Sequence, residues 1–362
     1  MNRPIHGGNL AWAAALAGCP PDSISDFSAS INPLGPPQSA IAAIQAHLQA
    51  LRAYPDPDYH QLREALGQFH HLSPEWFLPG NGAAELLTWA GWELASLGAT
   101  YLVTPAFGDY WRSLRAVNAQ VIECSCWQQH RLGDEEDNHL FIPRISSHAW
   151  GESGLLINNP HNPTGQMFSR ASLQPYLEEF ALVVIDEAFM DFLPTEEQQS
   201  AIAWVQDYPN LVILRSLTKF YSVPGLRLGY AIAHPDRLRR WQKWRDPWPV
   251  NVLAAAAGVA MLADGEFQQQ TWNWLPAARQ QLFTGLGELP GLQPYPSRAN
   301  FLLVGSEPPS SEIQAKLLKQ SQILIRDCLS FPELGDRYFR VAVRSAAENQ
   351  RLISGLAAVL RE

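Results

Sequence analysis

The stretch LVILRSLTKFYSVPGLRLGY, Leu211–Tyr230, decides the fold class of this 362-residue chain. Its beginning, Leu211–Leu214, is short and apolar and predicts a buried strand. Lys219 follows at the carboxyl end of that strand, where open α/β sheets bind their ligands, and its amine can bond covalently to an aldehyde. Three nearby side chains can donate hydrogen bonds to a phosphate, namely Ser216, Thr218 and Arg227. The stretch therefore indicates a carbonyl cofactor with a phosphate group, such as pyridoxal phosphate (PLP).

Other interpretations of the same lysine exist. A lone lysine after a strand is ordinarily a surface residue. Ser216 and Lys219 also fit the Ser-x-x-Lys pattern of serine acyl hydrolases, but the chain has neither of the companion motifs Ser-Asp-Asn and Lys-Thr-Gly. A binding module without catalysis is the non-enzymatic alternative, and it predicts a protein without a yellow cofactor chromophore.

Composition limits the class of protein. The chain is 46% apolar and 17% charged, so it can bury a large core and form two domains. A net charge of −9 argues against a nucleic acid or an anionic membrane as partner. The first residues lack an apolar core and no run of about 18 apolar residues occurs, so the sequence predicts neither export nor a membrane span, and no metal site is expected. The scattered cysteines fit the reducing cytoplasm, and they are Cys19, Cys124, Cys126 and Cys328.

Helix and strand patterns alternate along the chain, which predicts an α/β fold with a mostly parallel sheet. Helices are expected at 38–53, at 85–97, in the region from 235 to 286 and from Ala346 onward. Strands are expected at 116–124, 154–157, 181–185, 211–214, 301–304, 323–325 and 338–343. We expect an N-terminal arm (1–36), a large domain (37–240), and an interdomain helix with a small α+β domain (241–362). Trp241, Trp244 and Trp248 are expected to pack at a domain junction, and 128–151 to form a surface loop.

Four more segments carry candidate chemistry. Pro79–Glu85 places glycines at a helix start, where backbone N–H groups can approach a phosphate. Asp186 ends an apolar strand and can pair with a protonated pyridine nitrogen, although a helix-capping aspartate is the simpler alternative. Asn158–Gly165 is a rigid loop that places Asn162 toward a ligand. The last segments offer two guanidinium groups for an anion, Arg326 and Arg340.

The motifs appear in the order Gly-Asn-Gly, Asn-Asn-Pro-His-Asn-Pro-Thr-Gly, Asp-Glu-Ala-Phe and Ser-Leu-Thr-Lys. In this order the chain resembles, from end to end, the fold-type I, class I/II aminotransferase family. Within it the chain is most similar to the L-threonine O-3-phosphate decarboxylases of cobalamin biosynthesis, with the histidinol-phosphate aminotransferases close by. This similarity rests on His6–Asn9, Asp26–Gly35, Asp186–Phe192 and Arg340–Ser345. The resemblance implies a PLP-dependent carboxy-lyase, or alternatively a histidinol-phosphate:2-oxoglutarate aminotransferase.

The resemblance also implies a role for individual residues. Lys219 would hold PLP covalently, Asp186 would pair with its pyridinium nitrogen, and Asn162 would contact its ring oxygen. Phe107 would stack on the ring, and Tyr54 would reach the cofactor phosphate of a neighbouring subunit in a homodimer. The cofactor phosphate would also contact Ser216, Thr218, Arg227 and the backbone of Ala83 and Ala84. A small phosphorylated amino acid substrate would contact His6, Gly7, Ser30, Asn162, Arg326 and Arg340.

Two positions depart from the patterns of the relatives. Phe189 stands where transaminating relatives usually carry tyrosine, which favours the decarboxylase branch. Ser30 stands where the decarboxylase pattern has an asparagine that contacts the substrate, and its shorter side chain bears on substrate choice.

Overall fold

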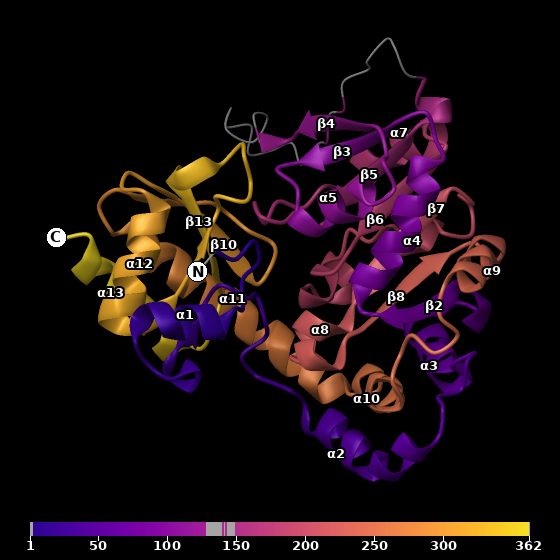
Figure 1. Ribbon diagram of the computed structural model, residues 1–362, viewed down its shortest axis with the longest axis horizontal. Coiled ribbons are helices and arrows are strands. Elements are labelled where there is room, and N and C mark those ends of the chain that lie inside the picture. Colours follow the sequence, from indigo (N-terminus) through magenta and orange to yellow (C-terminus); the bar gives the residue numbers. More distant parts are fainter. Residues whose placement is uncertain (1–2, 128–139, 141, 143–148, 362) are drawn as a thin grey trace.

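The larger of two bodies is built on a seven-stranded mixed sheet (Figure 1). The computed structural model describes residues 3–127, 140, 142 and 149–361. The strand order in the large sheet is β2-β8-β7-β6-β5-β3-β4, and only β8 runs antiparallel to its neighbours. The strands are β2 (Phe77–Asn81), β3 (Thr100–Thr104), β4 (Val121–Ser125), β5 (Gly154–Asn158), β6 (Leu182–Asp186), β7 (Leu211–Ser216) and β8 (Leu228–Ala233). The predicted α/β class with a mostly parallel sheet is confirmed.

Helices cover both faces of this sheet because its strands are apolar on both sides. In β6, Leu182 and Val184 pack into one core cluster while Val183 and Ile185 pack into the other. The first cluster is closed by α4 (Ala83–Ala95), α5 (Gly108–Arg115) and α9 (Pro235–Trp244). The second cluster is closed by α3 (His60–His70), α7 (Arg170–Glu179) and α10 (Val252–Leu262), and α2 (Gln38–Ala46) packs on α10.

The smaller body contains an antiparallel sheet of order β12-β13-β10-β9. Its strands are β9 (Leu292–Pro294), β10 (Phe301–Ser306), β12 (Arg326–Asp327) and β13 (Tyr338–Ala342). Its helices are α11 (Gly265–Gly287), α12 (Ser310–Ser321) and α13 (Ala346–Val359). The N-terminal segment joins this body: α1 (Leu10–Ala17) packs on α12, and β1 (Ser25–Asp26) pairs in parallel with β11 (Ile323–Leu324) (Figure 1).

Several predicted elements differ from the structure in their bounds. The helix expected at 38–53 ends at Ala46, where the His47 side chain bonds the Ala43 carbonyl, and a 3-10 helix (Leu48–Arg52) follows. The strand expected at 116–124 begins only at Val121, because Ala116 caps α5 and Asn118 adopts a left-handed turn conformation. The strand expected at 323–325 is divided, since β11 pairs with β1 whereas β12 pairs with β13.

Two expectations about packing also need correction. Trp241 is fully buried in the core cluster beneath α4, where its indole donates to Glu93, so it stabilises the large body and not a domain junction. The segment 128–151 lies mostly outside the described residues. Its Leu140 and Ile142 are buried and bond the Tyr176 hydroxyl through their backbones, so they do not belong to a surface loop. The three-part division at residues 36 and 240 stays a prediction.

Within the described residues, no helix combines the length and the apolar character that crossing a membrane requires.

Candidate active site

A cavity of about 180 Å³ opens at the carboxyl ends of β5, β6 and β7. Open α/β sheets bind ligands at this edge. Its lining combines the large body with the N-terminal segment and β13. The predicted site residues that line it are His6, Gly7, Ser30, Phe107, Asn162, Asp186, Lys219 and Arg340, and Phe189 lies among them. The structure therefore brings together residues that are up to 334 positions apart in the sequence (from His6 to Arg340).

Lys219 stands on the short helix α8 (Leu217–Phe220) that directly follows β7. Its Nζ donates to the Ser216 Oγ at 3.1 Å and lies 5.7 Å from the centre of the Phe189 ring. Burial lowers the pKa of Lys219 below 10.5, the nearby Asp186 carboxylate opposes that shift, and Arg227 and Arg340 lower it further. A lysine with a lowered pKa is more often neutral, which makes it a better nucleophile for a carbonyl.

Asp186 is the last residue of β6, and its carboxylate is held on both oxygens. The Tyr110 hydroxyl donates to Oδ2 at 2.8 Å and the Ala188 N–H donates to Oδ1 at 2.9 Å. Burial raises the pKa of Asp186, whereas Lys219 and these hydrogen bonds lower it. The helix-capping alternative does not describe this residue, because the next helix, a 3-10 helix at Met190–Phe192, is capped by Phe189. The Asp186 carboxylate instead lines the cavity beside Lys219.

Donors for a phosphate gather between β7 and the start of α4. The Ser216 and Thr218 hydroxyls are 2.7 Å apart, and Ser216 also accepts from Lys219. Gly82 precedes α4 with φ of +74°, and a Cβ built on it would lie 2.6 Å from Nη2 of Arg227. The first N–H groups of a helix have no acceptor within it, so those of Ala83 and Ala84 can serve a ligand.

Asn162 is held by the loop that follows β5. Its backbone N–H donates to the Asn158 Oδ1 at 2.6 Å, and the Asn158 amide donates to the Asp186 carbonyl at 2.6 Å. The Arg340 guanidinium donates to the Asn162 Oδ1 and, at 3.2 Å, to the Ser28 carbonyl. Arg340 also lies 4.8 Å above the Phe301 ring, and burial lowers its pKa to about 10.

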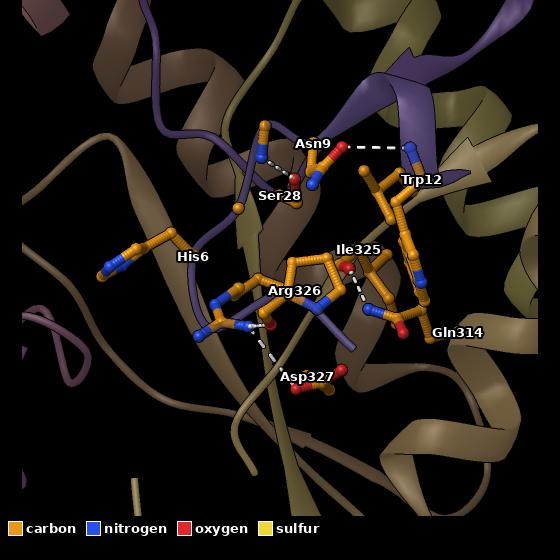
Figure 2. A pocket seen from close by; sticks show the side chains of 12 residues that line it. His6, Asn9, Trp12, Ser28, Gln314, Ile325, Arg326 and Asp327 are labelled. Carbon is orange, nitrogen blue, oxygen red and sulfur yellow. Dashed lines mark hydrogen bonds and ion pairs between the residues drawn. The ribbon is translucent and has the colours of Figure 1, made fainter. Parts of the chain in front are cut away.

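His6 and Gly7 of the N-terminal segment line one side of this cavity. The same two residues also line a second pocket, which includes Ser28 and Arg326 (Figure 2). Arg326 on β12 donates to the backbone carbonyl of Ile5 and ion-pairs with Asp327 at 3.5 Å, so it faces this segment and not the main cavity. His6 points away from Arg326 (Figure 2). Its ring packs against that of Phe107, with ring centres 5.3 Å apart. Burial and Arg326 together lower the pKa of His6.

Gly7 permits this closure, because a Cβ there would lie 2.2 Å from the Ser28 carbonyl oxygen.

Two predicted site residues have unusual surroundings. Ser30 is buried at the cavity wall, and its Oγ has no hydrogen-bond partner in residues 3–127, 140, 142 and 149–361. Tyr54 is 77% exposed and stacks on Trp248 with ring centres 4.3 Å apart, so it is not part of the cavity of its own chain.

The motif order and this geometry agree with the comparisons. A family model described as aminotransferase class I and II matches residues 22–356. The chain belongs to this family. It is 39% identical over 360 residues to the threonine-phosphate decarboxylase of Salmonella typhimurium, covering 98% of this chain and 96% of that one. It is also 35% identical over 338 residues to the histidinol-phosphate aminotransferase of Symbiobacterium thermophilum, covering 91% and 89%.

A solved structure shows the same fold. The histidinol-phosphate aminotransferase of Sinorhizobium meliloti, crystallised with pyridoxal-5'-phosphate, superposes with a TM-score of 0.82 at 22% identity. The superposition covers 98% of this chain and 95% of that one.

The site of this class I/II family member fits PLP by its donor set. A lysine amine and a buried carboxylate face one cavity, and hydroxyls, a guanidinium and free helix N–H groups lie beside the lysine. The close approach of Arg227 to Gly82 leaves no room for a side chain at residue 82, which keeps the helix start open for a phosphate.

The contacts of three residues at this site were missed from the sequence. Tyr110 and Asn158 both bond Asp186, and Ser28 bonds both Gly8 and Asp26. Tyr110 lies three residues after Phe107 at the start of α5, and a helix places residues of this spacing next to each other on one face. That spacing was the available signal, but its partner Asp186 is 76 residues away.

Proposed function

We propose that the protein is a PLP-dependent lyase that converts L-threonine O-3-phosphate to (R)-1-amino-2-propanol O-2-phosphate and carbon dioxide in cobalamin biosynthesis. The observation that carries this proposal is a single cavity in which the amine of Lys219, the carboxylate of Asp186 and the buried guanidinium of Arg340 meet beside the hydroxyl-free ring of Phe189. The 39% identity to a threonine-phosphate decarboxylase over nearly the whole chain supports it.

The cofactor would be held by residues that already form one cluster. Lys219 would bind its aldehyde carbon, Asp186 its ring nitrogen and Asn162 its ring oxygen, while Phe107 would stack on its face. Its phosphate would be held by Ser216, Thr218, Arg227 and the N–H groups of Ala83 and Ala84. When bound, PLP supplies an electron-accepting ring that stabilises the negative charge left when a bond at the substrate α-carbon breaks.

The protein selects the bond that breaks by orienting the substrate. Arg340 would supply a positive group for the phosphate or carboxylate of the substrate, and His6, Gly7 and Ser30 line the wall beside it. Arg326 would supply the second positive group when the N-terminal segment, whose carbonyls it bonds, moves aside. Ser30 has a free hydroxyl for this purpose among the residues that the structure describes. After carbon dioxide leaves, Lys219 in its protonated form would donate a proton to the α-carbon in place of the lost carboxylate.

The proposal is tested by incubating the purified protein and PLP with L-threonine O-3-phosphate, and by measuring carbon dioxide and the amino alcohol phosphate. We expect the release of carbon dioxide to depend on Lys219. Release no greater than that of the Lys219→Ala variant contradicts the proposal.

Histidinol-phosphate transamination is the second candidate, because a histidinol-phosphate aminotransferase is 35% identical to this chain. The assay for it supplies histidinol phosphate and 2-oxoglutarate and measures glutamate. Phe189 speaks against this reaction, since it places a bare ring beside Lys219 where transaminating relatives carry a phenol. Glutamate formation faster than carbon dioxide release from threonine phosphate would reverse the order of the two candidates.

We further propose a homodimer, supported by the exposed stack of Tyr54 and Trp248. An exposed aromatic pair is the kind of surface that protein interfaces bury. In the dimer, Tyr54 would contact the cofactor phosphate of the partner subunit.

A further inference from the structure

A buried ionic network lies behind the candidate active site. Arg215 is 1% exposed, and its guanidinium pairs with Glu187 at 2.8 Å, with Asp191, and with the Ser200 Oγ at 3.0 Å. Glu187 is fully buried and accepts from the Ser200 Oγ at 2.7 Å and from the Ala201 N–H at 2.9 Å. The network therefore joins the ends of β6 and β7 to the segment that lies between the two strands in the sequence.

Each member of the central pair is the chain neighbour of a site residue. Glu187 follows Asp186, and Arg215 precedes Ser216, which accepts the hydrogen bond from Lys219. Successive side chains of a strand point to opposite faces of a sheet. Asp186 and Ser216 therefore face the cofactor cavity while Glu187 and Arg215 face away from it. The Glu187 N–H donates to the Leu214 carbonyl at 2.8 Å, which keeps the two strand ends in register.

Stability alone is a weak reason for such a network. Buried ion pairs lose the hydration of both charges, and apolar residues of similar volume often stabilise a protein equally well. This network is also imperfect, because the Nε of Arg215 has no partner within the described part of the chain. A positional role explains both the burial of three charged groups and the location of two of them, Glu187 and Arg215, one residue from Asp186 and Ser216.

We infer that Arg215 is a positioning residue: by pairing with Glu187 and Asp191 it fixes the ends of β6 and β7, and so fixes the Asp186 carboxylate relative to the Lys219 amine. This inference rests on the proposed use of PLP but not on the identity of the substrate. Lysine in place of Arg215 keeps the charge but cannot form a fork with two carboxylates.

The test compares Arg215→Lys with the parent protein in the PLP-loaded form. We expect the pH midpoint of the visible cofactor band to fall by about half a pH unit, because a displaced Asp186 stabilises the positive charge at Lys219 less. We also expect kcat to fall at least about tenfold with little change in KM, since small misplacements in a site are costly. Glu187→Gln, which keeps the shape of the side chain, should shift the midpoint in the same direction.

Arg237→Lys is the matched control. Arg237 is also a largely buried arginine that pairs with a glutamate, Glu93, but it lies on α9 away from the cavity. This variant should lower the melting temperature and leave the band unchanged. Folded Arg215→Lys and Glu187→Gln proteins with an unchanged band midpoint and kcat would overturn the inference, even if both melt earlier. The spectral result can be read even if threonine phosphate is not the substrate, because it needs only PLP.

Discussion

At the scale of single residues, the charge of Asp186 depends on the Tyr110 hydroxyl. It donates to the Asp186 Oδ2 at 2.8 Å, and this bond lowers the pKa of the buried carboxyl. In Tyr110→Phe the pKa of Asp186 should therefore rise, leaving less carboxylate to pair with a pyridinium nitrogen. Because a hydrogen bond to a charged group contributes about 1.5–3 kcal/mol, we expect affinity for PLP at pH 7 to weaken about tenfold or more. A titration of the cofactor absorbance measures it.

Tyr101→Phe is the control for this prediction. The Tyr101 hydroxyl is buried on β3, and it has no hydrogen-bond partner in the described portion of the molecule. Its removal should leave the affinity for PLP unchanged. Equal affinities for the parent and for Tyr110→Phe would show that the hydroxyl does not support Asp186.

The charge on Lys219 gives a second prediction at this scale. Burial lowers the pKa of Lys219, so the folded protein binds this proton less tightly than the unfolded chain does. The contribution of Lys219 to the stability of the fold is therefore lost as pH falls through the lowered pKa. Only the neutral amine attacks an aldehyde. The rate at which pyridoxal reacts with the cofactor-free protein should therefore be half-maximal below pH 10.5.

Asp186→Asn should lower that midpoint, because the Asp186 carboxylate raises the pKa of Lys219. The rate of absorbance change after pyridoxal addition, followed against pH, measures both midpoints. Asp236→Asn changes an exposed carboxylate on α9 and should have no effect. A midpoint that rises in Asp186→Asn would show that the two groups are not coupled as the structure indicates.

At the scale of secondary-structure elements, the start of α4 depends on Gly82. A residue with a side chain is strained at φ of +74°, and its Cβ would collide with the guanidinium of Arg227. Gly82 has φ of +74° and ψ of 163°, a region that is essentially restricted to glycine, and we expect Gly82→Ala to destabilise the fold by about 1–3 kcal/mol from the strained backbone. It should also weaken PLP binding, because Arg227 must move away from the helix start.

Gly265→Ala provides the comparison for both effects. Gly265 begins α11, its φ lies outside the left-handed region, and a Cβ there meets no described atom within 4 Å. This variant should have a free energy of unfolding within about 0.5 kcal/mol of that of the parent and should bind PLP normally. Normal PLP affinity in Gly82→Ala would show that the phosphate does not use this helix start.

The sequence predicted elements best where one pattern was uninterrupted. The apolar runs of β5, β6 and β7 and the capped start of α13 were expected within a few residues. β3 and β8 were not predicted although both are apolar, and β2 was missed because Pro79 and Gly80 interrupt its apolar pattern. Proline and glycine are tolerated in β2 because it is an edge strand of the sheet. The division between β11 and β12 depends on which strands pair, and no local pattern contains that information.

The candidate site shows the same limit. Lys219 and Asp186 were found because each follows a recognisable strand, and the loop of Asn162 has a distinctive composition. Tyr110 and the Arg215 network were not found, since their roles come from partners that are distant in sequence or on the other face of the sheet. The position of Tyr54 within a dimer depends on a second chain, and its role therefore stays a prediction.

At the scale of the whole molecule, the site requires both bodies and, as we propose, a second subunit. Lys219 and Asp186 come from the large sheet, Arg340 from the small sheet and His6 from the N-terminal segment. Tyr54 is 77% exposed in its own chain, which leaves it available to a partner. If Tyr54 serves the neighbouring site, two different inactive or impaired chains should complement each other.

Co-expression of a Lys219→Ala chain with a Tyr54→Ala chain tests this arrangement. A mixed dimer would contain one complete site, with Lys219 from the Tyr54→Ala chain and Tyr54 from the Lys219→Ala chain. Random pairing of equal amounts should give about a quarter of the parent activity, because half of the dimers are mixed and each has one intact site. Activity is measured as carbon dioxide release from threonine phosphate, alongside each variant alone. If Tyr54 instead serves its own chain, every site that contains Lys219 lacks Tyr54. The mixture would then be no more active than the average of the two variants measured alone.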